Sequence, residues 1–267
     1  MAGGTALYFS SALQNINVSY LLVTALAESD MQYVTDLRNK GIEVRVQPSA
    51  HTVYFENIYA EDQDHRTQNV LEKADPFTMD QLQSVNAKIF HLGALLADDI
   101  STDMIKALAA KGRVSLDAQG YLRKVENKKV YPVDWPEKRE ALQYVTILKA
   151  DEAEMEVLTG HRDVEKGAKL LAEWGVKEVV ITNGSMGSVI YSEGTFYDIP
   201  AYKSKIAEDA TGCGDTYMAG YLYQRVKQQN IQQSGQFAAA MASLKMESPG
   251  PFSGTEVDIV NLLSKHF

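Results

Sequence analysis

The sequence predicts an α/β protein whose central sheet is mainly parallel. Short apolar runs of strand length alternate along the chain with longer segments whose apolar residues recur three and four positions apart. Buried strands that alternate with amphipathic helices indicate a parallel sheet covered by helices on both faces. The chain has 267 residues, of which 45% are hydrophobic and 23% charged, so it can bury a large core. We therefore expect a single domain over residues 1–267.

Strand and helix segments follow one another along the first two thirds of the chain. The short apolar runs predict buried strands, and the periodic segments between them predict helices. The expected strands are Tyr20–Thr24, Lys88–Leu92, Val114–Asp117, Val145–Leu148 and Glu178–Thr182. The expected helices are Met31–Lys40, Thr102–Lys111, Asp151–Leu158 and Val164–Trp174.

Two regions break this alternation. Residues 42–77 hold the strand-like segments Glu43–Val46 and Thr52–Tyr59, followed by the polar run Glu61–Gln68, and predict a small extra sheet carried on the main domain. The end of the chain predicts consecutive helices, with Pro249-Gly250-Pro251 as an interruption. These helices are Thr211–Gln228, Ile231–Met246 and Thr255–Lys265.

Charge and cysteine content argue against several classes of protein. The chain has 26 Lys and Arg against 35 Asp and Glu, a formal net charge of −9, which disfavours a nucleic-acid binder held by a basic surface. A single cysteine, Cys213, allows no intrachain disulfide and fits a reducing compartment. No apolar run approaches the ~18 residues that a membrane span needs. We expect a cytoplasmic protein whose partners are small molecules, with no nucleic acid and no membrane.

The segment Glu208–Gly220 carries the clearest chemical signal. Gly212 and Gly214 flank Cys213, and helical periodicity begins just after them, so backbone N–H groups are expected at a helix N-terminus that binds anions. Asp215 would then take a proton from a substrate hydroxyl while the N–H groups neutralise a transferring phosphoryl group. The residues alone leave a structural alternative open, in which the glycines form a tight turn and Asp215 only stabilises the helix.

Four segments resemble the motifs of the ribokinase-like, or PfkB, carbohydrate kinases. In chain order they are similar to the family patterns G-G-x-A, L-K-x-N-x-x-E…L-x-G, T-x-G-x-x-G and D-T-x-G-A-G-D. The segments are Gly3-Gly4-Thr5-Ala6, Leu148–Gly160, Val180–Ser188 and Asp209–Asp215. The resemblance implies a ribokinase-like three-layer αβα domain with a mainly parallel sheet, on which residues 42–77 form a small β lid.

The resemblance also implies a role for each candidate site residue. Asp215 resembles the catalytic base, and Gly212, Cys213 and Gly214 resemble the anion hole for the transferring phosphoryl group. Glu154 and Asp151 would organise Mg²⁺, although Asp151 stands where the family usually has asparagine and both belong to an acidic cluster that could equally be a solvated helix face. The residues expected to bind ATP are Thr182, Gly184, Gly187, Thr211 and Gly250. Those expected on the substrate side are Gly3, Gly4, Asn57 and Arg66.

These roles imply a kinase that transfers the γ-phosphate of ATP to a hydroxyl of a sugar, nucleoside or cyclic polyol. The expected cofactors are ATP and Mg²⁺, with a monovalent cation as a further candidate. The sequence contains no G-x-x-x-x-G-K-[ST] loop, and its Gly212–Gly214 turn lacks the G-x-G-x-x-G spacing of a dinucleotide site. Pairing of exposed lid strands between two copies would form a homodimer.

The chain departs from the family pattern at its start. Family members commonly place a strand with an acidic substrate-binding residue before the Gly-Gly element, whereas this sequence reaches Gly3-Gly4 at once. We therefore expect the first strand to be missing. The alternative to a kinase is a non-catalytic nucleotide- or metabolite-binding member of the same fold.

Overall fold

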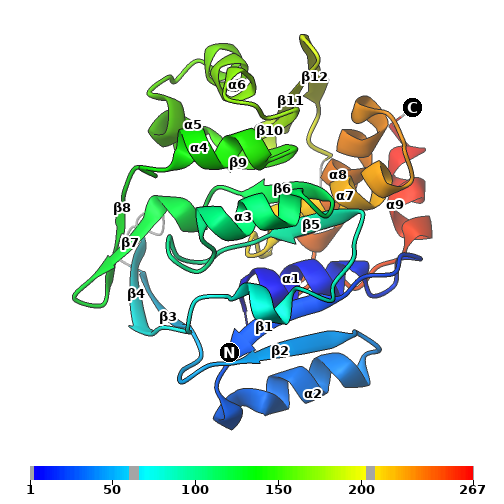
Figure 1. Ribbon diagram of the computed structural model, residues 1–267. Helices are drawn as coiled ribbons and strands as arrows, with labels where there is room; N and C mark the ends of the chain where they lie inside the picture. Colours follow the sequence, from blue (N-terminus) through cyan, green and yellow to red (C-terminus); the bar gives the residue numbers. More distant parts are fainter. Residues whose placement is uncertain (1–2, 60–65, 203–207, 267) are drawn as a thin grey trace.

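A six-stranded sheet forms the centre of the molecule. The structure is a computed structural model that describes residues 3–59, 66–202 and 208–266. The sheet order is β12-β11-β10-β9-β6-β5 (Figure 1). β5, β6, β9 and β10 run parallel to one another, whereas β11 runs antiparallel to both of its neighbours, β10 and β12. The strands are β5 (Ile89–Leu92), β6 (Arg113–Asp117), β9 (Ile147–Asp151), β10 (Glu178–Thr182), β11 (Ser188–Ser192) and β12 (Thr195–Ile199). The predicted mainly parallel sheet is confirmed.

Helices cover both faces of this sheet. Alternate residues of one strand face opposite sides: Leu148 and Val179 lie in one core, and Ile147 and Val180 lie in the other. The first core packs under α3 (Thr102–Ala109), α4 (Lys138–Ala141), α5 (Glu152–Thr159) and α6 (Val164–Glu173). The second packs under α1 (Gly4–Leu13), α7 (Cys213–Val226), α8 (Ile231–Lys245) and α9 (Glu256–Leu263). The protein therefore has the three-layer αβα architecture expected from the sequence.

A separate βαβ unit lies beside β5. β1 (Leu22–Leu26) and β2 (Val44–Pro48) pair in parallel, and α2 (Met31–Asn39) connects them. The segment Glu43–Val46 was expected in the lid, and this assignment is wrong. Val44 instead packs with Val34 and Leu37 of α2 in a small core of their own, which ties the strand to β1.

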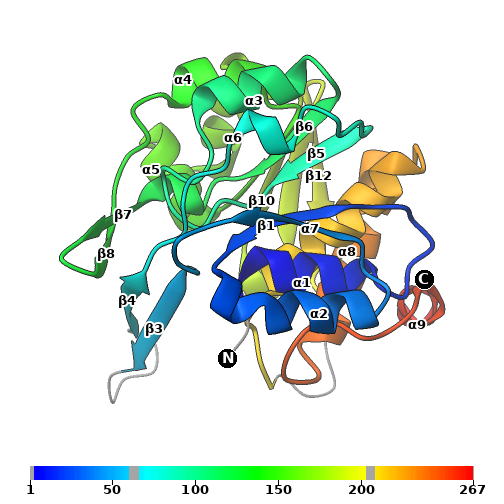
Figure 2. The ribbon, with the colours of Figure 1, turned by 60° about the horizontal axis from the view of Figure 1, so that its bottom comes forward.

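The lid is a four-stranded antiparallel sheet with the order β3-β4-β8-β7. β3 (Tyr54–Tyr59) and β4 (Arg66–Glu72) come from the region predicted to form it, whereas β7 (Arg123–Glu126) and β8 (Lys129–Pro132) come from a hairpin that the prediction missed. Asn127 and Lys128 both have positive φ, +48° and +65°, which is typical of a two-residue hairpin turn. In Figures 1 and 2 the two hairpins lie side by side and project from the main body.

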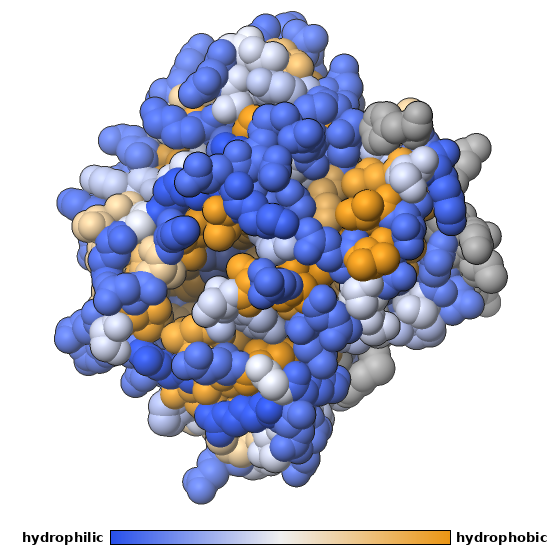
Figure 3. All heavy atoms as spheres, turned by 90° about the vertical axis from the view of Figure 1, so that its right-hand side faces the viewer, coloured by the Kyte–Doolittle hydropathy of each residue, from blue (hydrophilic) through white to orange (hydrophobic). Residues whose placement is uncertain are grey.

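The three consecutive helices predicted for the C-terminal part of the sequence are confirmed. α7 and α8 pack along each other, and Thr255 caps α9 with a reciprocal pair of hydrogen bonds to Asp258. Figure 3 shows the side of the molecule where α9 lies; apolar patches interrupt a mostly hydrophilic surface there, and Val257 and Val260 of α9 are exposed. Scattered apolar residues of this kind are common on folded domains. Across the described ranges, no helix is long and apolar enough to cross a membrane.

Candidate active site

The loop before α7 brings the predicted anion-binding glycines to the start of a helix. Gly212 is the N-cap with φ +75°, a left-handed conformation that favours glycine. A Cβ at this position would overlap the ring of Tyr8 from α1. The N–H of Cys213 donates to the carbonyl of Ala210 at 3.2 Å, and the N–H of Thr216 donates to the carbonyl of Gly212 at 2.9 Å, so an anion at this helix start would meet the amides of Gly214 and Asp215. Burial raises the pKa of the Cys213 thiol to about 11, so the side chain is a neutral packing group.

We expect Gly212→Ala to destabilise the protein more than Gly250→Ala does. Both glycines have positive φ, +75° and +79°, but among the described residues no atom lies within 4 Å of a Cβ built on Gly250. In the control, Gly250→Ala, backbone strain alone should lower the free energy of unfolding by about 1 kcal/mol. Gly212→Ala should lower it by roughly 2–4 kcal/mol because Tyr8 must also move. Urea unfolding of the two variants measures the difference. Equal losses would show that the Tyr8 contact does not constrain this turn.

Asp215 lies half-buried in the first turn of α7. The Thr5 hydroxyl from α1 hydrogen-bonds to its carboxylate. Burial, and then the negative charge of Asp117, raise the pKa of Asp215 to about 6, while Thr5 and the charges of Lys149 and Arg123 oppose the shift. A carboxylate with this pKa is mostly ionised at neutral pH and is still basic enough to accept a proton.

The start of α1 holds Thr5 in place. Gly4 has φ +76°, and a Cβ built on it would lie 3.4 Å from Cδ1 of Leu95. A side chain at Gly93 would overlap that of Thr5, so the loop after β5 passes directly beside this helix turn. The predicted substrate-side pair Gly3 and Gly4 thus adjoins the predicted base, through a threonine that the sequence analysis gave no role.

Lys149 places a buried ammonium beside the first turn of α7. Its side chain on β9 is only 7% exposed, and Nζ lies 3.2 Å from Asp117 Oδ2 and 3.7 Å from Glu154 Oε2. Nζ is also 3.4 Å from a Cβ built on Gly214. Burial alone would lower the pKa of Lys149, but the carboxylates of Asp117 and Glu154 outweigh it and hold the pKa above its ordinary value. A permanent positive charge therefore faces the first turn of α7.

The predicted metal-side acids form a capping box at the start of α5. Asp151 Oδ1 accepts from the Glu154 N–H at 2.7 Å, and Glu154 Oε2 accepts from the Asp151 N–H at 2.8 Å. Burial raises the pKa of Glu154, and Lys149 opposes this shift. Among the described residues, no group of three or more His, Cys, Asp or Glu side chains is arranged to hold a metal ion. The set still fits Mg²⁺, which keeps most of its waters and is bound through one or two carboxylates and substrate phosphates.

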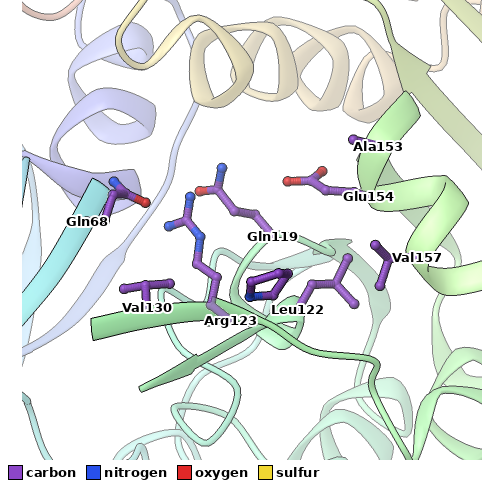
Figure 4. Close-up of a pocket in the computed structure, with 9 residues that line it drawn as sticks. Gln68, Gln119, Leu122, Arg123, Val130, Ala153, Glu154 and Val157 are labelled. Carbon is purple, nitrogen blue, oxygen red and sulfur yellow. The ribbon is translucent and has the colours of Figure 1, made fainter. Parts of the chain in front are cut away.

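A cavity of about 400 Å³ separates the lid from α5. Figure 4 shows the side chains of Gln68, Gln119 and Arg123 turned toward the same space as Glu154 on the opposite wall. Because the charge of Arg123 acts on Asp215, the cavity adjoins the base. Polar heads over an apolar floor suit a small polar ligand. The lining residues are Gln68, Gln119, Leu122, Arg123, Val130, Pro132, Ala153, Glu154 and Val157.

Several residues predicted to bind ATP lie at the end of the sheet where Asp151 ends β9. Thr182 ends β10 opposite Asp151 of β9, and Gly184 and Gly187 form the turn into β11 with φ +48° and +99°. Asn183 in this turn donates to Glu152 Oε1 at 2.7 Å and, with Met186, lines a second cavity of about 360 Å³.

The other residues predicted to bind ATP, Thr211 and Gly250, lie in or near the loop before α7. The N–H of Thr211 donates to Asp209 Oδ1 at 2.9 Å. Gly250 follows α8, where the carbonyl of Met246 accepts from the N–H of Glu208 at 2.9 Å. The loop after α8 therefore runs beside the start of the motif.

Comparison with known proteins agrees with this geometry. The family model described as pfkB family carbohydrate kinase matches residues 2–257. The chain belongs to this family.

Relatives that match this chain in sequence include proteins named as nucleoside and sugar kinases. A cytidine kinase of Thermococcus kodakarensis is 32% identical over 140 residues, 52% of this chain and 48% of that protein. A nucleoside kinase of Methanocaldococcus jannaschii is 38% identical over 93 residues, 34% of this chain and 31% of that protein. The matches thus span about half or less of these relatives.

Solved structures match over almost the full chain. A pyrophosphate-dependent kinase of the ribokinase family, in complex with a pyrophosphate analogue and myo-inositol, superposes with a TM-score of 0.86 at 30% identity, covering 97% of this chain and 91% of the other. A ribokinase of Arabidopsis thaliana complexed with ribose and ATP has a TM-score of 0.80 at 22% identity, covering 98% and 88%, and shares the fold.

The structure brings most of the predicted site residues to one region and adds two that were missed. Gly3, Gly4, Glu154 and the α7 glycines adjoin Asp215 or its neighbours. Asn57 and Arg66 lie in β3 and β4, but their side chains fall outside the described residues. The missed residues are Thr5 and Lys149. The signal for Lys149 was a charged residue inside an apolar strand, which is expected only where it is paired.

Proposed function

We propose that this pfkB family member transfers the terminal phosphoryl group of ATP to a hydroxyl of a sugar, nucleoside or cyclic polyol. One observation carries the proposal: the half-buried carboxylate of Asp215, whose pKa is raised, lies in the first turn of α7, and the Lys149 ammonium of β9 faces that turn. A base and a phosphate-binding cation stand side by side, as phosphoryl transfer to a hydroxyl requires. This pairing favours the catalytic interpretation of Asp215 over a helix-stabilising acid alone.

In the proposed reaction, the acceptor hydroxyl lies against Asp215. Its oxygen attacks the terminal phosphorus, its proton passes to the Asp215 carboxylate, and the bond from phosphorus to the bridging oxygen breaks to release ADP. The amides at the start of α7 and the Lys149 ammonium stabilise the negative charge on the transferring group. Glu154, with Asp151 beside it, would hold Mg²⁺ through its waters, and this ion supplies further charge neutralisation when bound.

The pH dependence of kcat/KM should report the base. Asp215 must be ionised to accept the proton, and its pKa is about 6. We expect kcat/KM to be level above pH 7 and to fall about tenfold per pH unit below pH 6. Steady-state rates between pH 4.5 and 8.5 at constant ionic strength measure this limb. A rate that stays level down to pH 5 would contradict the assignment.

Pyrophosphate is a second candidate donor. Two solved structures of a pyrophosphate-dependent kinase of the ribokinase family show 30% and 32% identity to this chain over 97% of its length. The amides of α7 and Lys149 would serve either donor, because both carry a terminal phosphoryl group on an anhydride oxygen. ATP differs from pyrophosphate by its α-phosphate and adenosine, and the residues proposed to bind ATP are Thr182, Gly184, Gly187, Thr211 and Gly250.

The lid cavity supports a polyhydroxylated acceptor. Gln68, Gln119 and Arg123 offer amide and guanidinium groups that match ring hydroxyls, and Leu122 and Val130 form an apolar floor. The relatives act on ribose, nucleosides or myo-inositol according to their names. These three classes are the acceptors proposed for this protein.

The edges of the lid support the proposed homodimer. β3 and β7 are the outer strands of the lid, and exposed edge strands tend to pair. Sedimentation equilibrium tests this: a single species at the mass of one chain would contradict it.

A donor and acceptor panel tests the proposed function. ADP or phosphate release is followed with Mg·ATP or Mg·pyrophosphate and with ribose, nucleosides or inositols, for the wild type and Asp215→Asn. Acceptor-dependent release that the substitution abolishes is the expected result, and the donor that supports it identifies the phosphoryl source. Donor binding without turnover on any acceptor would favour the non-catalytic alternative.

A further inference from the structure

Lys245 is a buried cation for which the proposed reaction has no use. It is the last residue of α8, and its side chain is 0% exposed. Nζ donates to the backbone carbonyl of Asp209 at 2.7 Å and lies 3.1 Å from Asp209 Oδ2. The ring of Tyr8 covers a third side, with its centroid 5.8 Å from Nζ. Burying an ammonium is costly, so its surroundings must supply oxygen partners of this kind.

The two groups that hold Lys245 also shape the anion-binding turn. Asp209 begins the motif, and its Oδ1 accepts from the Thr211 N–H at 2.9 Å. Burial would raise the pKa of Asp209, but hydrogen bonds from Thr211 and Lys245 outweigh it and lower the pKa to about 2, so the carboxylate stays charged. Tyr8 is the ring against which Gly212 packs. The ammonium therefore joins α8, α1 and the loop that leads into α7.

The partners of Nζ are those that a monovalent cation would take. Such ions are bound by backbone carbonyls and carboxylates, and an ammonium makes the same contacts through its three N–H groups. Because Lys245 is covalently attached, it holds this position at any salt concentration. A monovalent cation was a candidate cofactor from the sequence, and these oxygens adjoin the anion-binding turn that it would support.

We propose that the Lys245 ammonium is a built-in monovalent cation that positions residues 209–212 and thereby the anion site at the start of α7. The protein then needs no free monovalent cation for donor binding. Removing the ammonium creates a site that K⁺ or NH₄⁺ fills. Lys245 is a positioning residue, since it acts through Asp209 and Tyr8, and the inference rests on the proposed function for its effect on the donor.

Donor affinity in two salts tests the inference. Binding of Mg·ATP and Mg·pyrophosphate is measured by calorimetry in tetramethylammonium chloride, which is too large for the site, and in KCl or NH₄Cl at equal ionic strength. The wild type should change less than about twofold between salts. Lys245→Met should bind donor about tenfold more weakly in tetramethylammonium, because Asp209 loses its partner, and should recover in K⁺ or NH₄⁺. Lys227→Met removes a partly exposed ammonium at the far end of α7 and should match the wild type.

Two outcomes would overturn the inference. Stimulation of the wild type by K⁺ to the same degree as Lys245→Met would place the cation elsewhere. Equal donor affinity of the wild type and Lys245→Met in tetramethylammonium would show that the ammonium does not position the turn.

Thermal unfolding in the same salts separates this inference from the proposed function. K⁺ should raise the unfolding midpoint of Lys245→Met but not that of the wild type or Lys245→Arg, whether or not any donor binds. Equal shifts for all three proteins would contradict the inference, even if Lys245→Met is too unstable for calorimetry. Failure of every protein to bind a donor would instead count against the proposed function.

Discussion

Asp215→Asn should lower kcat by about two to four orders of magnitude, because an amide cannot take the proton of the acceptor hydroxyl. The side chain keeps its shape and can still accept from Thr5, so donor affinity should change little. Asp103→Asn is a matched control, since Asp103 is an exposed acid in the first turn of α3. Steady-state kinetics of the two variants separate a base from a helix-stabilising acid. Similar rates for both variants would contradict the role of Asp215.

The same substitution should make the protein more stable at neutral pH. The pKa of Asp215 is about 6 in the folded protein against 3.8 for the unperturbed group, so the folded state holds this proton more tightly. Its contribution is favourable at low pH and is lost as the pH rises through 6, which costs up to about 3 kcal/mol at pH 7. Asparagine carries no charge to desolvate. Urea unfolding should therefore show a gain for the variant at pH 7 that shrinks toward pH 4, and a loss at pH 7 would contradict this account.

Lys149→Met should impair both stability and activity. The substitution leaves the carboxylates of Asp117 and Glu154 without their cation in a buried site, which should cost roughly 3–5 kcal/mol of stability. Loss of positive charge beside the transferring phosphoryl group should lower kcat by about 10²–10³-fold. Lys169→Met is the matched control, because its ammonium pairs with Glu165 on the exposed face of α6.

The pH profile distinguishes a role in the site from mere destabilisation. Lys149 lowers the pKa of Asp215, so its loss should move the acidic limb of kcat/KM upward from about pH 6. A variant that loses stability while its profile stays in place would show that Lys149 supports the fold without acting on the base.

Much of the fold was predictable because hydrophobic periodicity reports burial directly. β9 and β10 lie between two cores, so apolar residues that face both sides, such as Ile147-Leu148 and Val179-Val180-Ile181, mark them as central strands. β2 was harder, because Glu43–Val46 resembles an edge strand, and it is assigned to β1 by their parallel pairing and by its packing on Val34 and Leu37. The β7–β8 hairpin was missed because its strands are only four residues long, β7 is mostly charged, and the turn residues Asn127 and Lys128 are not glycine.

Site residues that belong to one local motif could be predicted from the sequence, whereas those brought together by tertiary packing could not. Gly212 and Asp215 stand in one continuous motif whose local geometry determines their position, so the sequence indicated them together. Thr5 and Lys149 come from elements far apart in the chain and meet Asp215 only through tertiary packing. Lys245 is a lone charge at the end of an apolar helix, and its partner lies 36 residues away.

Direct detection of the product is the most decisive measurement. Phosphorus NMR can follow Mg·ATP and Mg·pyrophosphate in the presence of ribose, nucleosides and inositols, with the wild type and with Asp215→Asn. We predict that the wild type forms a phosphate monoester of one acceptor class at the expense of one donor, and that the variant forms none on the same time scale. Release of inorganic phosphate without an ester, or equal ester formation by both proteins, would contradict a kinase that uses Asp215 as its base.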